Sequence, residues 1–202
     1  MNKKTTKCKI LECAKSLFCK HGIDGTSIRD IAKNADVNLS AINYHFKSKE
    51  NLYKEIFTTE YIQLSNEIEK LLDNSKSIID LSSLTFNLLK KNGKSLLFIF
   101  HSFLNLDLDP KLFYNEDIRE FGPIGTKTFL KQLDLDLGAK ESEISIEKKI
   151  WLVRSLLAMI IHIAISLQSP FLKKLDENTS ILGSSHQNDS IENLAKALFN
   201  SI

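Results

Sequence analysis

Apolar residues recur three and four positions apart along most of the chain, which is the spacing of helices with one buried face. The first such stripe consists of Ile10, Leu11, Ala14, Leu17 and Phe18. Thr5 or Thr6 stands where a helix N-cap is needed, and Gly22 stands where a helix ends. The pattern therefore predicts a first helix that stops at about Gly22.

Two short helices and one long helix are predicted next. Ser27-Ile28-Arg29-Asp30 has the arrangement of a capping box, with Asp in the fourth place, and opens a helix that carries Ile28, Ile31 and Ala32. Ala35-Asp36-Val37 predicts a turn, and Asn38 is placed to cap a third helix from about Leu39 to Phe46. Ser48 is placed to cap a long fourth helix, whose apolar positions are Leu52, Ile56, Leu64, Ile68 and Leu71.

The remaining residues predict five more helices and no sheet. The expected helices lie near 76–91, 94–106, 113–134, 144–168 and 189–200. Pro123 should break or kink the third of them, and Pro170 should end the long apolar helix. Residues 176–188 are expected to form a loose connection. With seven Gly and three Pro in 202 residues, the fold class is all-α.

Charge is unevenly distributed along the chain. Residues 1–50 hold ten Lys or Arg against five Asp or Glu, whereas the remainder holds 17 against 20. A basic N-terminal region suggests that it meets a polyanion, although chance imbalance in a Lys-rich chain is an equal alternative.

Cysteine and histidine give no sign of a metal site or a cofactor. Cys8, Cys13 and Cys19 fit no metal or redox spacing, their odd number argues against a disulfide framework, and the five His are scattered. Charged residues interrupt every N-terminal apolar stretch, so no export signal is predicted. We expect a reduced, cytoplasmic protein with no metal and no cofactor.

One segment, Ile150 to Leu167, is long and apolar enough to raise the question of a membrane span. It contains Arg154 and His162, and an arginine inside a membrane is costly. We therefore interpret it as a helix that is buried in this chain or in a dimer.

The three helices of the first 46 residues, with a tight turn between the second and the third, predict a helix-turn-helix that places its last helix in the major groove of DNA. Short polar and apolar groups on that helix suit base edges, and donors beyond it suit phosphates. The helix amide ends near Ser27 and Lys49 also suit phosphate. The candidate DNA-binding residues are Ser27, Arg29, Leu39, Ser40, Ala41, Asn43, Tyr44, His45 and Lys49.

Some residues of this stretch have a simpler alternative. Ile42 and Phe46, four residues apart, are expected in the core. Taken alone, Tyr44 would more often be half-buried packing, and His45 would more often be a solvated or internally bonded histidine. A helix-turn-helix pattern by itself is not specific.

Residues 10–53 resemble the DNA-binding domain of the TetR family of bacterial transcription regulators. The matching segments are ILECAKSLF, HGIDGTSIRDIAKNADV and NLSAINYHFKSKENLY. This chain has Asp36 where the family commonly has Gly, and Asn43 where many members have Tyr. Asp tolerates the left-handed conformation better than most residues, so the turn should form.

The resemblance implies an all-α homodimer with a helix-turn-helix DNA-binding domain, residues 1–48, and a larger effector-binding and dimerisation domain, residues 49–202. It implies dimerisation through the helices near 144–168 and 189–200, and a near-palindromic operator on double-stranded DNA. It also implies repression that a small effector relieves by shifting the fourth helix.

The resemblance does not say which residues bind the effector. Aromatic and other residues of the middle and late helices could line an apolar cavity, although such residues at helical spacing are more often plain core. The candidates are Phe86, Phe98, His101, Phe121, Met159 and His162.

Two other function classes remain as alternatives. An all-α enzyme would need a nucleophile with a base or paired carboxylates, and Glu116, Asp117 and Glu120 are more simply solvated charges. A DNA-binding dimer without a small effector fits the same residues, and an activator fits them as well as a repressor.

Overall fold

A computed structural model describes residues 5–105, 114–115, 120–121, 123–170, 172, 174 and 184–199. The chain divides into two compact units, one of residues 1–61 with 98–108 and the other of residues 62–97 with 109–202. Helix α4 (Lys49–Leu71) therefore begins in the first unit and ends in the second. The division into a DNA-binding domain, residues 1–48, and an effector-binding and dimerisation domain, residues 49–202, stays a prediction.

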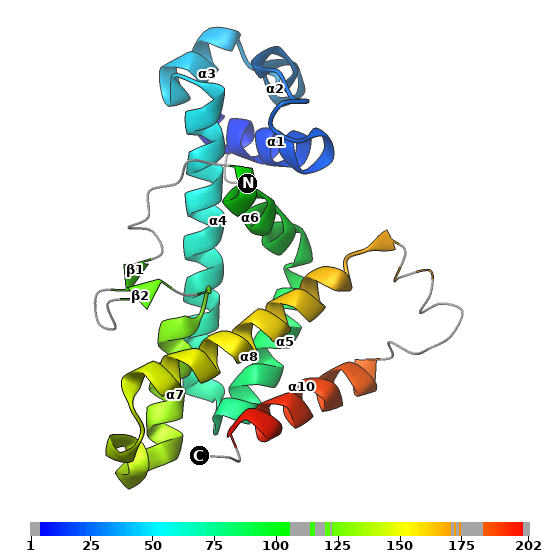
Figure 1. Cartoon of the computed structure of the whole chain (residues 1–202). Helices are drawn as coiled ribbons and strands as arrows, with labels where there is room; N and C mark the ends of the chain where they lie inside the picture. The colour runs from blue at the N-terminus through cyan, green and yellow to red at the C-terminus, as the bar shows by residue number, and fades with distance from the viewer. Residues whose placement is uncertain are drawn as a thin grey trace. The chain divides into compact units, whose positions relative to one another are not determined.

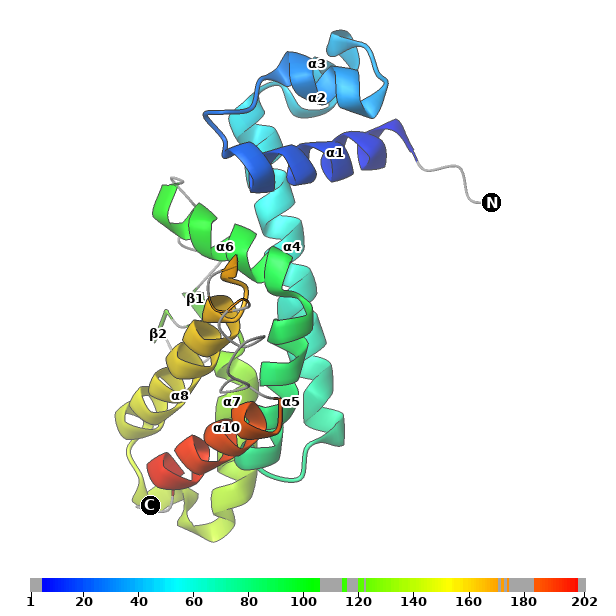
Figure 2. The ribbon, with the colours of Figure 1, turned by 90° about the vertical axis from the view of Figure 1, so that its right-hand side faces the viewer.

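The described elements confirm the all-α fold class (Figures 1 and 2). The helices are α1 Thr6–His21, α2 Ile28–Ala35, α3 Leu39–Phe46, α4, α5 Ile78–Lys91, α6 Gly93–Asn105, α7 Thr126–Leu137, α8 Ile146–Ser166 and α10 Ser184–Phe199. Two 3-10 turns, η1 Leu72–Asn74 and η3 Gly138–Glu143, continue α4 and α7. Two strands of two residues each, β1 Tyr114–Asn115 and β2 Glu120–Phe121, pair antiparallel with Tyr114 opposite Phe121.

Local capping signals determine where the first helices begin and end. The Thr5 side chain accepts a hydrogen bond from the Cys8 backbone at the start of α1, and Gly22 ends that helix at φ 74°. Ser48 accepts from the Asn51 backbone at the start of α4. Asn38 holds the N-cap position of α3 with extended backbone, but its side chain does not form the capping hydrogen bond that we expected.

Two predictions about the later chain are wrong in part. The helix expected over 113–134 is replaced at its start by β1 and β2, and α7 begins only at Thr126, three residues after Pro123. Proline at 123 and Gly125 at φ 92° prevent a continuous helix there. The connection expected over 176–188 is helical from Ser184. Helix α8, by contrast, ends at Ser166, before Pro170 and close to the end expected from the sequence.

The second unit packs α5, α7, α8 and α10 against one another around an apolar core. Gly125 lies close to this core, since a Cβ there would stand 3.2 Å from Ile68 Cγ2. The Lys149 ammonium, on the buried side of α8, contacts Asp134 Oδ1 at 2.8 Å and Glu141 Oε1 at 3.0 Å. These ion pairs join the start of α8 to α7 and η3.

Helix α8 is long and apolar enough, by length and composition alone, to cross a membrane, with a mean hydropathy of 1.6. In the structure 39% of its apolar window is buried. Core helices of soluble proteins meet the same criterion, and one side of α8 packs on α5 and α7.

Candidate nucleic-acid interface

The turn between α2 and α3 is built from two local features. The Ser27 side chain accepts from the Asp30 backbone while the Asp30 carboxylate accepts from the Ser27 backbone, so the predicted capping box is confirmed. Asp36 takes the left-handed conformation, φ 53° and ψ 52°, and the next amide, of Val37, donates to Ala32 O at 3.1 Å. The chain therefore turns within a few residues and starts α3 at a fixed angle to α2.

Helix α3 has one buried side and one outward side. Ile42 and Phe46 are buried, as expected, and pack with the core residues of α1 and α2. On the outward side the exposed fraction is 41% for Leu39 and 83% for Tyr44. An aromatic ring that is this exposed does not serve the protein's own core, which removes the packing alternative for Tyr44.

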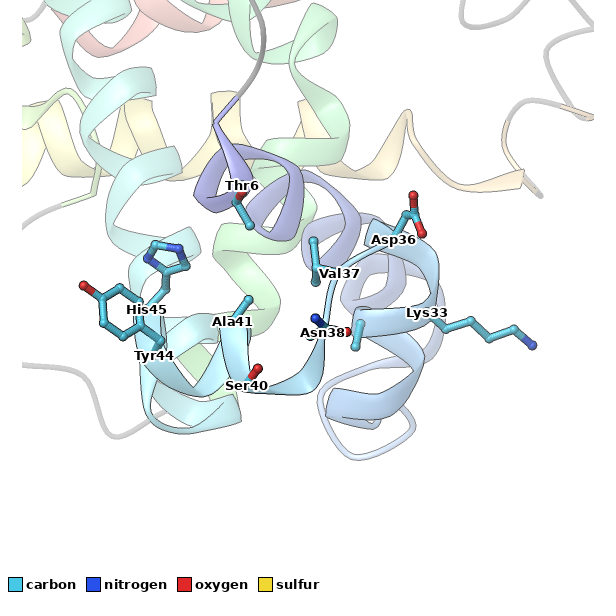
Figure 3. A pocket seen from close by; sticks show the side chains of 10 residues that line it. Thr6, Lys33, Asp36, Val37, Asn38, Ser40, Ala41, Tyr44 and His45 are labelled. Carbon is cyan, nitrogen blue, oxygen red and sulfur yellow. The ribbon is translucent and has the colours of Figure 1, made fainter.

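An open groove runs along the outward side of α3 and the turn before it (Figure 3). It is lined by Thr6, Ala32, Lys33, Asp36, Val37, Asn38, Ser40, Ala41, Tyr44 and His45. Tyr44 and His45 project from α3 on one side of the groove, with their ring centroids 5.2 Å apart, and Lys33 extends away on the other side. Hydroxyl, amide, imidazole and ammonium groups thus share one exposed surface, which suits base edges and phosphates.

The structure brings four of the nine predicted DNA-binding residues into this groove, namely Ser40, Ala41, Tyr44 and His45. Leu39 and Asn43 are exposed on the same helix, and Ser27 and Arg29 are exposed at the start of α2. Sequence reasoning missed Lys33, which a search for basic residues beside the turn would have found. It also missed Thr6, because only the packing of α1 places that residue beside α3.

The corner between α3 and α4 is tightly fixed. Lys47 has φ 66° and ψ −43°, and the amide of Ser48 donates to Phe46 O at 2.8 Å, which makes a γ-turn of the strained, positive-φ type. The Lys47 side chain is exposed at the end of α3. Strain of this kind persists only where the surrounding structure enforces it.

Lys49, predicted to hold phosphate, has two of its donors occupied by the protein. Its ammonium donates to Ile23 O at 2.8 Å and to Thr26 O at 3.2 Å. A direct contact between Lys49 and DNA stays a prediction.

Ion pairs tie α1 to α4 beneath the groove. Lys7 Nζ lies 2.7 Å from Glu55 Oε1, and Lys15 Nζ lies 2.6 Å from Glu60 Oε1. The Lys7 ammonium also stands 5.6 Å from the centre of the Phe46 ring. These contacts bring the start of α1 close to α3, which explains why Thr6 reaches the groove.

Hydrogen bonds lower the pKa of two carboxyls in the first turns of α2 and α4. The hydroxyl of Ser27, and then its backbone amide, hold the pKa of Asp30 below its usual value. At Glu50 the pKa is lowered by its own backbone amide and then by the side chain of Ser48. Both carboxylates therefore strengthen helix N-termini in their charged form.

The candidate effector residues lie in different environments. Phe98 is buried in the first unit, with its ring 4.9 Å from that of Tyr53, and His101 is exposed in the same unit. Phe86 is fully buried in α5, whereas Met159 and His162 are exposed one turn apart on α8. The side chain of Phe121 lies outside the described residues. Their role with an effector stays a prediction.

Metal binding finds no support in the described part of the chain. There, no group of three or more His, Cys, Asp or Glu side chains is placed to hold a metal ion.

Apart from Thr6, the residues that line the groove lie in a segment that matches a known family. Residues 10–56 match the model of the bacterial regulatory proteins of the tetR family. YttP of Bacillus subtilis strain 168, named as a probable HTH-type transcriptional regulator, is 43% identical over 72 residues, which are 36% of this chain and 35% of YttP. IcaR of Staphylococcus aureus, named as the negative transcriptional regulator of the biofilm operon icaADBC, is 35% identical over 72 residues, which are 36% of this chain and 39% of IcaR. The matches thus span little more than a third of these relatives.

Solved structures share the fold over nearly the whole chain. A TetR family transcription regulator from Marinobacter aquaeolei VT8 has a TM-score of 0.67 at 15% identity and covers 96% of this chain and 94% of that one. A transcriptional regulator from Aquifex aeolicus VF5 has a TM-score of 0.60 at 23% identity, over 96% of this chain and 100% of that one. At these identities the likeness concerns the fold alone.

Proposed function

Because residues 10–56 match the model of the bacterial regulatory proteins of the tetR family, we propose that the chain is a transcription regulator that binds a near-palindromic operator as a homodimer. The observation that carries the proposal is the outward side of α3, where Tyr44 is 83% exposed beside Ser40 and Asn43 while Ile42 and Phe46 hold the helix from below. The capping box of α2 and the buried residues of α3 hold the helix in place, and its exposed groups are of the chemical kinds that contact DNA.

The proposal of a homodimer rests on the apolar residues at the exposed side of α8. Trp151 is 68% exposed and Met159 is 45% exposed on a helix whose opposite side packs into the core. Large exposed apolar groups on one helix are typical of an interface between subunits. We propose that α8 and α10 of two copies pair around a two-fold axis, which gives the dimer two recognition helices for two half-sites.

We further propose that the regulator is a cytoplasmic repressor that a small apolar effector releases from DNA. IcaR, a relative in the matched region, is named as a negative regulator. An effector that enters between α5 and α8 would contact buried apolar residues such as Phe86 and Leu89, which favours an apolar compound over a sugar or a nucleotide. The effector need only bind the DNA-competent and DNA-incompetent states unequally.

The test of DNA binding starts from random duplex DNA. The wild-type protein should enrich a two-fold motif, and its affinity for that motif should fall with salt along a linear log–log plot. Tyr44→Ala should weaken binding to the motif without unfolding the protein. If no sequence is enriched and Tyr44→Ala has no effect on DNA binding, the proposal is wrong.

The test of the effector is a thermal-shift screen with apolar compounds. A ligand that binds only the native state raises the apparent melting temperature, and such a hit should also lower the affinity for the selected motif. Hits that leave DNA binding unchanged, or a screen with no hit, would favour the alternative of a DNA-binding dimer without a small effector.

A further inference from the structure

The ammonium of Lys49 faces the protein's own backbone. Lys49 is the first residue of α4 and is half-buried, unlike Lys47, which is exposed. Its Nζ donates to the carbonyl oxygens of Ile23 and Thr26, at 2.8 and 3.2 Å. Both acceptors belong to the loop between α1 and α2, more than twenty residues away in the sequence.

That loop holds the start of α2 in place. It begins at Gly22, with φ 74°, and the hydroxyl of Thr26 donates back to Gly22 O at 2.8 Å. A Cβ at Gly25 would stand 2.2 Å from His21 O, so the loop closes tightly on the end of α1. The next residue, Ser27, is the N-cap of α2. Any shift of the Thr26 carbonyl therefore moves the first turn of α2.

A phosphate contact that drew the Lys49 ammonium away from this loop would break two charge-assisted hydrogen bonds, and only the third N–H can reach elsewhere without breaking them. Hydrogen bonds to charged groups are stronger than those between neutral groups, and buried carbonyls left without a donor are costly. Thr26 is buried, which makes its carbonyl hard to satisfy with solvent. The two bonds thus favour an inward ammonium in the DNA-bound state as well.

We propose that Lys49 is a positioning residue, which fixes the start of α2 against the start of α4 so that α2 and α3 meet DNA in one orientation. This proposal rests on the proposed DNA-binding function. It assigns Lys49 an internal role instead of the phosphate contact that the sequence suggested.

The experiment compares Lys49→Met, Lys49→Arg and the control Lys47→Met on the selected duplex over a range of salt concentrations. Lys49→Met keeps the aliphatic stem and removes the donors. We expect it to lower the affinity of the folded protein by about tenfold, since a charge-assisted bond is lost, with an unchanged salt slope. Its midpoint of urea unfolding should fall, and Lys49→Arg should restore most of the affinity.

A direct phosphate contact gives the opposite pattern. The log–log salt slope of Lys49→Met would then become shallower by about 0.9, with urea unfolding unchanged, and the proposal would be overturned. It would also be overturned if folded Lys49→Met bound DNA as tightly as the wild type, because the role would then be structural only. Lys47→Met, which alters an exposed ammonium near by, should leave urea unfolding unchanged.

A measurement on the wild type covers the case in which Lys49→Met does not fold. The hydrogens of an ammonium that donates to two carbonyls exchange slowly, so its nitrogen signal should be visible by NMR in the free protein. That signal should persist when DNA binds. Its loss or a large shift on addition of DNA would contradict the proposal. Failure of the wild type to select any DNA motif would instead refute the proposed function, and the free-protein signal would still test the internal bonds.

Discussion

Helices α3 and α8 both leave part of their surface uncovered, but the uncovered groups differ in kind. The eight residues of α3 bury Ile42 and Phe46 and present hydroxyl, amide and phenol groups outward. The 21 residues of α8 bury seven side chains and still expose Trp151 and Met159. A polar exposed face suits a hydrated, charged partner such as DNA, whereas an apolar exposed face suits another apolar face.

The contrast teaches that exposure alone does not identify a partner. Tyr44 at 83% and Trp151 at 68% are similarly exposed aromatic residues. Their neighbours differ, since Tyr44 stands beside Ser40 and Asn43 in a basic region, whereas Trp151 shares its helix with the exposed Met159 and has the Arg154 guanidinium 5.7 Å from its ring centre. On this basis α3 would bind DNA and α8 would bind a second copy of the chain.

The largest effect on stability is expected where a buried side chain that holds α3 in place is removed. Phe46→Ala should lower the free energy of unfolding by about 3–5 kcal/mol, because a buried ring is replaced by a cavity. Tyr44→Ala, two residues earlier on the same helix, should change it by less than about 0.5 kcal/mol. Urea denaturation measures both. Equal losses for the two variants would mean that Tyr44 also belongs to the core.

The next effect concerns the apolar face of α8. Trp151→Asp should raise the dimer dissociation constant by about 100-fold or more, since an unpaired charge would be buried between the subunits. Leu135→Asp on α7 is the matched control, because Leu135 is 69% exposed and Trp151 is 68% exposed. Sedimentation equilibrium measures both constants. A dimer that Leu135→Asp weakens and Trp151→Asp does not would place the interface on α7.

A smaller effect is expected at the corner that ends α3. Lys47→Val should destabilise by about 1–2 kcal/mol, because a β-branched residue fits poorly at φ 66°. Lys47→Gly relieves that strain but adds freedom to the unfolded chain, so it should stay within about 1 kcal/mol of the wild type. Thermal unfolding of the two variants checks this. A valine variant as stable as the glycine variant would show that the corner is not strained.

The smallest effect is the pH dependence of the α2 capping box. Since the folded-state pKa of Asp30 lies below its usual value of 3.8, its stabilisation is present above that value and is lost as pH falls through the folded-state pKa. Asp30→Asn should therefore be slightly less stable at neutral pH and should lose less stability below pH 3.8. Urea midpoints measured at neutral and acid pH give the difference. Identical acid sensitivity of variant and wild type would assign the loss to other carboxyls.

Local signals made the first unit predictable. The capping box at Ser27 and Asp30, the turn at Asp36 and the stop at Gly22 each act within a few residues, so the sequence contains what is needed to place α1, α2 and α3. Once these helices are placed, the exposed face of α3 can also be predicted. The inward position of the Lys49 ammonium could not be predicted, because its acceptors, the carbonyls of Ile23 and Thr26, come close to it only through the tertiary fold.

The later chain was harder to predict because long-range packing determines it. The helix expected from residue 113 depended on apolar spacing, which cannot distinguish a helix from the short strand pair that forms at Tyr114–Asn115 and Glu120–Phe121. The candidate effector residues were chosen by residue type. Phe86 is buried whereas Met159 is exposed, and the spacing of apolar residues in the sequence does not reveal that difference.

The central claim is that α3 reads DNA while α8 joins two copies, so that one dimer spans two half-sites. The most direct test inserts five base pairs, about half a helical turn, at the centre of the selected motif and measures binding by fluorescence anisotropy. The account predicts that the insertion reduces the affinity to that of a single half-site, because the second recognition helix would face the wrong side of the duplex. Unchanged affinity would show that each subunit binds its half-site alone, which would contradict the account.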